Sequence, residues 1–111
     1  GMVLAELSTA VDHNINTTTI VFNNGSWGAE KSYQKDFFSE RYIGADVSSP
    51  QFDKVAELYG CKGYKVEKVS EIKDAIDDSL NCGKPAVIDV AVDPNALYSF
   101  RRDSFEHKIK N

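Results

Sequence analysis

The chain has 111 residues, which is room for one domain of ordinary size. Its formal net charge is −4 at pH 7 and it has no basic patch beyond Arg101 and Arg102, which argues against a nucleic acid partner. No apolar run approaches the roughly 18–20 residues that a membrane span needs, and no secretory signal is visible, so we expect a cytoplasmic protein with no membrane partner.

The amino-terminal part predicts a helix followed by a strand. In residues 3–13 the apolar side chains recur at helical spacing and form one stripe. His13 would end this helix, where capping is a better interpretation than catalysis. The β-branched and aromatic run at 17–22 predicts a buried strand, and residues 23–26 (Asn-Asn-Gly-Ser) predict a turn.

Two oxygen donors stand at the end of this first strand. In an open parallel sheet, ligands bind just beyond the carboxyl ends of the strands. The side-chain oxygen of Asn24 and the backbone carbonyl of Ser26 would lie there, and both are hard donors suited to Mg²⁺. On local chemistry alone, Asn24-Gly25 is a turn former, and Gly25 lets the backbone bend without a Cβ clash.

Residues 28–49 form the least regular segment, with aromatic side chains among charged ones. A short helix over 32–40 and a lid over a ligand are both open interpretations. Its aromatic side chains either pack locally or promote self-association.

The second half predicts two further helix–strand pairs. Ser49 as N-cap before Pro50 predicts a helix that ends at Gly60, followed by a short strand at a sheet edge around residues 64–66. Ser70 is the expected N-cap of a helix that Gly83 ends.

Residues 86–92 are nearly continuously apolar, as in a parallel strand covered on both faces. Asp89 inside this run needs a partner, either a backbone amide or an arginine. The alternation of helices and strands predicts an α/β fold, a three-layer sandwich with a mostly parallel sheet.

Two further groups of residues were considered for chemistry. Cys61 and Cys82 lack the spacing of a zinc or redox pair, so we expect two free, partly buried thiols. Arg101 and Arg102 suit an anion such as a sulfonate or phosphate, or else form surface salt bridges with the acidic residues that follow them.

Several segments resemble the thiamine diphosphate-dependent enzymes. Residues 18–31 resemble the second half of their cofactor motif, which opens with Gly-Asp-Gly and closes with Asn-Asn. Within that superfamily the chain is most similar to the sulfoacetaldehyde acetyltransferases, through residues 9–14, 27–31 and 100–103. The resemblance implies a thiamine diphosphate-binding fold, thiamine diphosphate and Mg²⁺ as cofactors, and Asn24 and Ser26 as the metal ligands.

The resemblance also implies how much of that domain is present. By the family's spacing the Gly-Asp-Gly falls before Gly1, so we expect residues 1–111 to be a single partial domain, truncated at its amino terminus. Gly1 is interpreted as a tag remnant and residues 104–111 as a loose tail. Because one metal ligand is then missing, we expect this chain alone to be inactive.

For the site, the resemblance implies that Gly25 and Trp27 join Asn24 and Ser26 in binding the cofactor. Without it, Trp27 is a candidate core anchor. Glu30 is the candidate catalytic residue, because some decarboxylating relatives have a glutamate at the corresponding place. The alternative is a solvated Glu30 paired with a neighbouring lysine.

The implied activity is the conversion of sulfoacetaldehyde and phosphate to acetyl phosphate and sulfite, with a small-molecule substrate and a homo-oligomeric enzyme. Enzymes like acetolactate synthase or glyoxylate carboligase are the alternatives within the family. A different class stays open as well: a non-catalytic α/β module that self-associates through exposed strand edges.

Overall fold

The described part of the chain, residues 3–97 of a computed structural model, divides into two units. Within the described residues, the first unit contains 3–23 and 49–92, and the second contains 24–48 and 93–97. No helix within residues 3–97 has the length and apolar character needed to cross a bilayer. The expectations for Gly1, for Arg101 and Arg102 and for residues 104–111 lie outside the described residues.

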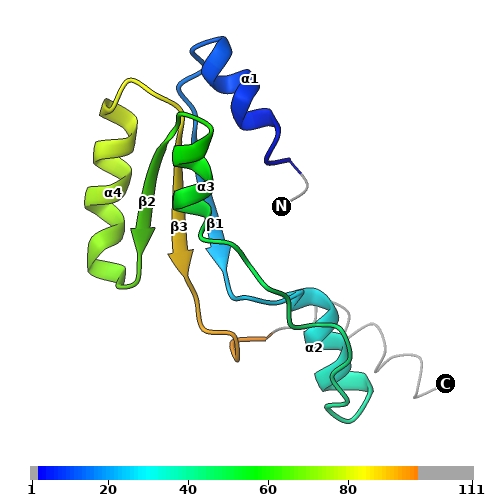
Figure 1. Ribbon diagram of the computed structural model, residues 1–111. Coiled ribbons are helices and arrows are strands. Elements are labelled where there is room, and N and C mark those ends of the chain that lie inside the picture. Colours follow the sequence, from blue (N-terminus) through cyan, green and yellow to red (C-terminus); the bar gives the residue numbers. More distant parts are fainter. Residues whose placement is uncertain (1–2, 98–111) are drawn as a thin grey trace, which may run out of the picture. The chain divides into compact units, whose positions relative to one another are not determined.

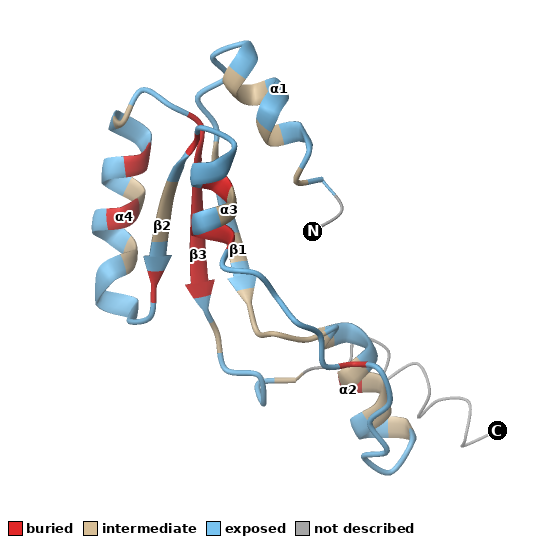
Figure 2. Cartoon of the chain, in the orientation of Figure 1, coloured by how far each residue is buried: buried red, intermediate tan, exposed pale blue. Residues whose placement is uncertain are grey.

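The first unit is built on a parallel sheet of three strands, β1 (Thr18–Asn23), β2 (Lys62–Val66) and β3 (Ala86–Ala91) (Figure 1). Their order is β1-β3-β2, with Ile20 and Tyr64 both in register with Ile88. Strand β3 lies in the centre and is buried along all but its last residue (Figure 2). The predictions of a central strand at 86–92 and of an edge strand around 64–66 are confirmed.

Helices cover both faces of this sheet, which confirms the three-layer α/β prediction. On one face, α1 (Glu6–Asp12) and α3 (Phe52–Leu58) contribute to a core that includes Val87 and Cys61. On the other face, α4 (Val69–Asn81) packs in a core that includes Ile88 and Val90. Side chains alternate along β3, so Val87 faces the first core and Ile88 the second.

The two cysteines are free thiols, as the sequence predicts. Cys61 is buried in the first core, and its burial raises the pKa of its thiol above the ordinary value. Cys82 is half-buried and is the C-cap residue directly after α4.

The prediction that the first strand is buried is wrong for this chain. Strand β1 has a neighbour on one side only among the described strands, which leaves its other edge open. Ile20 is 42% exposed and Phe22 is 72% exposed, on the face of the sheet that α4 covers. Apolar composition therefore identified a strand correctly but not its place in the sheet.

Both predicted helix N-caps are wrong, because each helix begins at a different residue from the one its predicted cap implies. Helix α3 begins at Phe52, not after Ser49, and the Phe52 N–H donates to Asp89 Oδ2 at 2.9 Å. This contact confirms a backbone amide as the partner that Asp89 needs. Helix α4 begins at Val69, so Ser70 lies inside it.

Glu71 takes the capping role at the start of α4. Its carboxylate accepts the backbone N–H groups of Glu67 and Lys68 at 3.0 and 3.1 Å. These two hydrogen bonds hold the pKa of Glu71 below its ordinary value, because they stabilise the ionised form. The predicted helix ends are confirmed, since Gly60 and Gly83 both adopt positive φ just after α3 and α4.

The second unit contains α2 (Gly28–Phe37), which begins four residues earlier than the predicted helix over 32–40. Tyr33 and Phe37 stack with ring centroids 6.0 Å apart, whereas Phe38 is 53% exposed. Local packing therefore accounts for some of the aromatic side chains of this segment and not for others.

Candidate functional site

The candidate site is the loop that directly follows β1. Asn24 comes immediately after Asn23, the last residue of that strand, and is half-buried. Its Oδ1 accepts the backbone N–H of Ser26 at 3.1 Å, and Gly25 between them has a φ of +64°. The loop is thus an Asx turn that needs the conformational freedom of glycine, as the local turn chemistry predicts.

A second segment of the same unit fixes the direction of the Ser26 carbonyl. Ser26 and Asp46 form an isolated antiparallel bridge. In it the Trp27 N–H donates to Ala45 O at 2.7 Å, and the Val47 N–H donates to Gly25 O at 3.1 Å. Because a trans peptide is planar, the carbonyl of Ser26 points opposite to the Trp27 N–H, away from Ala45.

The two predicted metal ligands therefore face the same side of the loop. In this kind of bridge the N–H and the C=O of the central residue both point away from the partner segment. The Ser26 N–H lies on the side of the Asn24 carboxamide, because it donates to Asn24 Oδ1. The Ser26 carbonyl oxygen shares that side, so two neutral oxygen donors lie on one side of the loop.

Two more features of the loop are a buried hydroxyl at Ser26 and the close approach of Gly28 to Asn24. The Ser26 hydroxyl oxygen is buried and has no hydrogen-bond partner within residues 3–97, although a buried polar atom ordinarily has one. A Cβ at Gly28 would lie 2.9 Å from Asn24 Nδ2, so only glycine there leaves the Asn24 carboxamide in its present position. The loop fits a site that a bound polar group completes.

The alternative pair between Glu30 and the neighbouring Lys31 does not form, because Lys31 has another partner. Lys31 pairs with Asp46, at 2.6 Å between Nζ and Oδ1, and not with Glu30. Glu30 is exposed in the first turn of α2. Trp27 is 53% exposed, so its interpretation as a core anchor is wrong for the described residues.

Sequence reasoning missed Gly28 and residues 45–47 as parts of this loop's support. The only local signal before the second segment is Gly44, which has a φ of +63° and turns the chain back. Nothing in the composition of residues 45–47 predicts which loop they would pair with. Gly28 belongs to the segment 27–31 that carries the family resemblance, but its closeness to Asn24 depends on the folded loop.

No group of three or more His, Cys, Asp or Glu side chains within residues 3–97 could hold a metal ion. The donors of the loop are therefore a carboxamide and a peptide carbonyl, both neutral. This donor set suits part of a Mg²⁺ site and lacks the carboxylate that Mg²⁺ usually binds in proteins.

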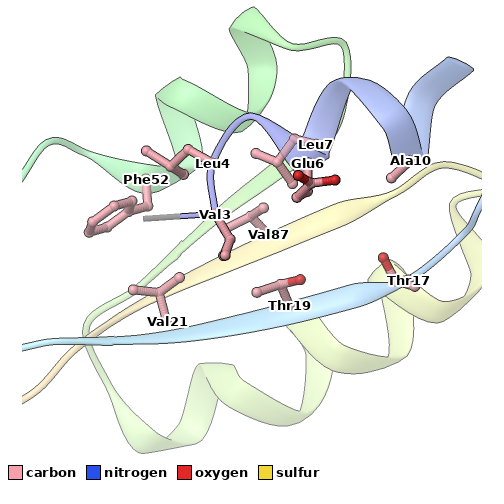
Figure 3. A pocket seen from close by; sticks show the side chains of 10 residues that line it. All are labelled: Val3, Leu4, Glu6, Leu7, Ala10, Thr17, Thr19, Val21, Phe52 and Val87. Atoms are coloured by element: carbon pink, nitrogen blue, oxygen red, sulfur yellow. The ribbon is translucent and has the colours of Figure 1, made fainter. Parts of the chain in front are cut away.

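The first unit has a cavity of about 220 Å³ that includes none of the predicted site residues (Figure 3). Its walls are mostly apolar side chains from α1 and the residues just before it, from β1, and from Phe52 and Val87. The few polar groups are those of Glu6, Thr17 and Thr19.

Comparisons with known proteins agree with this fold. The family model for the thiamine pyrophosphate enzyme, C-terminal TPP binding domain, matches residues 1–90. Sulfoacetaldehyde acetyltransferase from Castellaniella defragrans is 33% identical over 114 residues, which are 99% of this chain and 19% of that protein. A probable acetolactate synthase large subunit from Methanococcus aeolicus is 33% identical over 95 residues, which are 85% of this chain and 16% of that protein.

A solved structure gives the same result. The thiamine diphosphate-dependent 4-hydroxybenzoylformate decarboxylase of Rhodococcus jostii RHA1 superposes with a TM-score of 0.74 and 28% sequence identity. The superposition covers 81% of this chain and 17% of that one. The chain thus spans less than a fifth of the length of these relatives.

Proposed function

Because this chain belongs to the thiamine pyrophosphate enzyme family, through its C-terminal TPP binding domain, we propose that the loop after β1 is one wall of a thiamine diphosphate site in a larger enzyme. The observation that carries the proposal is the shared direction of two oxygen donors, Asn24 Oδ1 and the Ser26 carbonyl. Residues 1–111 would then be one partial cofactor domain of that enzyme.

In this proposal Asn24 and Ser26 are two of the protein ligands of a Mg²⁺ ion that holds the diphosphate. The carboxylate ligand would come from a Gly-Asp-Gly segment, which the printed sequence does not contain. Gly25 and Trp27 would line the cofactor, and Glu30 would hold or transfer a proton near it. When bound, the cofactor supplies the carbanion chemistry, while these residues bind and orient it.

For the whole enzyme we propose an acetyltransferase reaction of the sulfoacetaldehyde type, in which phosphate accepts the acetyl group and sulfite leaves. An acetolactate synthase reaction is the alternative. The similarity to a sulfoacetaldehyde acetyltransferase extends over 99% of this chain, compared with 85% for the acetolactate synthase relative, and this favours the first. A homo-oligomer acting on a small molecule is part of the same proposal.

Titration of the chain with Mg²⁺ and thiamine diphosphate tests the site. We expect amide chemical shifts to change at residues 24–30, with a dissociation constant weaker than micromolar because the carboxylate ligand is absent. Asn24→Ala should abolish these changes, since it removes one of two remaining donors. The matched control is Asn81→Ala on α4, whose carboxamide only bonds the Asp77 carbonyl at 2.7 Å.

Three results would contradict the proposal: shift changes confined to other residues, no shift changes at all, or identical titrations of the wild-type chain and Asn24→Ala. Sub-micromolar binding measured by calorimetry would contradict a separate expectation, that these residues hold only part of the ligand set. It would mean that another group of the chain supplies the charge.

A second candidate function, self-association, is favoured by the open edge of β1. This strand carries no charged residue, and Ile20 and Phe22 are exposed on it. The opposite edge strand, β2, carries Lys62 and Lys65, which would repel a second copy of itself. We therefore propose that two copies pair antiparallel through β1 about a two-fold axis.

Light scattering after size exclusion tests this pairing. We expect a dimer that Phe22→Lys converts to a monomer, because each copy would then bring a charged, strongly hydrated side chain to the paired edge. Leu58→Lys is the control, since Leu58 is 88% exposed on α3, away from β1. A wild-type chain that is monomeric at all concentrations would overturn the proposal.

A further inference from the structure

The ion pair between Lys31 and Asp46 joins the two segments that meet at the candidate site. Lys31 lies in the first turns of α2, and its N–H donates to the Trp27 carbonyl at 2.9 Å. Asp46 lies between the two residues whose backbones bond Gly25 and Trp27. The pair therefore ties the helix, the site loop and residues 45–47 together within one unit.

From this arrangement we propose that Lys31 and Asp46 are positioning residues, which set the direction of the Ser26 carbonyl and so prepare it to bind a divalent cation. The part of this inference that concerns cation binding rests on the proposed function. The structural part, the control of one peptide plane by one ion pair, stands on the geometry of residues 24–48 alone.

The first step of the argument is that the bridge needs support. The isolated bridge between Ser26 and Asp46 is closed by only two backbone hydrogen bonds, to Ala45 O and from Val47 N. A pair of strands this short is not stable by itself in water. Gly25, with its positive φ, adds conformational freedom on the loop side. Side chains must therefore help to hold residues 45–47 in place. Ala45 is buried, and the Gln34 carboxamide bonds the N–H and the C=O of Ile43 at 2.9 Å each, but neither contact involves Asp46, the residue at the centre of the bridge.

The second step is that this ion pair is better placed than an ordinary surface pair. The Lys31 side chain is only 15% exposed, although that of Asp46 is 72% exposed. The Lys31 ammonium also lies 5.5 Å from the centroid of the Tyr42 ring, on the segment that leads to residues 45–47. Partial burial reduces screening by water and salt, so the pair holds its geometry more firmly than exposed pairs do.

The third step connects the pair to the carbonyl. The Ser26 C=O and the Trp27 N–H belong to one planar peptide group, so they can turn only together. While the Trp27 N–H donates to Ala45 O, the Ser26 carbonyl must point away from residues 45–47, to the side of Asn24. Release of Asp46 would remove one of the side-chain contacts that hold residues 45–47, so the bridge should open and this peptide plane should rotate more often.

Amide hydrogen exchange and Mn²⁺ line broadening, both measured by NMR on the whole chain, test the proposal. We expect Asp46→Asn to raise the exchange rates of the Trp27 and Val47 amides about five- to ten-fold, because the bridge opens more often. Mn²⁺ should broaden the signals of Asn24 and Ser26 in the wild-type chain, and we expect about ten-fold weaker binding in the variant.

Three control experiments distinguish a specific effect on the Ser26 carbonyl from a general loss of protein stability. Asp77→Asn makes the same chemical change in the ion pair of Lys73 and Asp77 on α4, and should alter neither measurement. Asp46→Glu keeps the charge and should restore most of the Mn²⁺ binding. Lys31→Met and Asp46→Asn should have effects that do not add in the double variant, because they remove the same interaction.

The outcomes distinguish the two proposals. Unchanged exchange at Trp27 and Val47 in Asp46→Asn would overturn the inference, and so would faster exchange with unchanged Mn²⁺ affinity. If Mn²⁺ broadens no signal near Asn24 in the wild-type chain, the proposed function fails, while the exchange rates still decide whether the ion pair holds the peptide plane.

Discussion

Gly63→Ala is expected to lower the free energy of unfolding by about 3 kcal/mol or more, at the upper end of what overpacking costs. A Cβ at Gly63 would lie 2.1 Å from the backbone oxygen of Asp53 and 2.7 Å from its carbonyl carbon. Strand β2 thus approaches the backbone of α3 so closely that only glycine fits. Backbone atoms cannot rotate away as a flexible side chain can, so the helix would have to shift off the sheet.

Urea unfolding of the variant measures this loss, and Gly83→Ala is the control. Gly83 has a φ of +68° and open space around its Cβ position, so alanine there pays only for its left-handed backbone conformation, about 1 kcal/mol. If Gly63→Ala loses no more stability than Gly83→Ala, the close approach of β2 and α3 is not what fixes this glycine.

The elements that were predictable are those whose signal is local. A nearly continuous apolar run identified β3, and glycine at positive φ identified the ends of α3 and α4. The burial of β1 was not predictable, because a strand's composition does not say whether another strand lies beside it. Ile20 and Phe22 are apolar enough for a central strand and yet lie exposed at an edge.

The predicted starts of α3 and α4 were wrong because the sequence does not show which residue will cap a helix. Ser49 and Ser70 have the right chemistry for N-caps, and the structure uses neither. Asp89, 37 residues away in sequence from Phe52, supplies the acceptor at the start of α3. At α3 this long-range contact overrides the local capping preference, and a single sequence carries no record of it. At α4 the local Glu71 caps the residues just before the helix, so Ser70 lies inside it.

The candidate site also has a part that the sequence predicts and a part that it does not. Asn24 and Ser26 follow from the position of a polar turn after a strand, together with the family resemblance. The shared direction of their oxygen atoms depends on the bridge to residues 45–47, which no spacing rule predicts. The mutual arrangement of Gly28 and the Asn24 carboxamide is likewise a property of the folded loop.

Asp89→Ala is the second large prediction, with an expected loss of about 2 kcal/mol of unfolding free energy. Asp89 is 5% exposed in the central strand, and its Oδ2 accepts the Phe52 N–H at 2.9 Å and Asn23 Nδ2 at 3.4 Å. Alanine would remove the acceptor of the Phe52 N–H at the start of α3. No water could take the place of the lost carboxylate, so this buried amide would stay without a hydrogen bond. Favourable interaction of the carboxylate with the helix N-terminus would be lost as well.

The opposing term is the desolvation of a carboxylate in the core, which alanine would relieve. Asp89→Asn separates the two terms, because its carbonyl oxygen can still accept the Phe52 N–H while the charge is gone. If the hydrogen bond dominates, the asparagine variant should lose less than half as much stability as the alanine variant in urea unfolding. Equal losses would show that the charge matters more than the hydrogen bond, and a more stable alanine variant would show that burial of the carboxylate costs more than its contacts return.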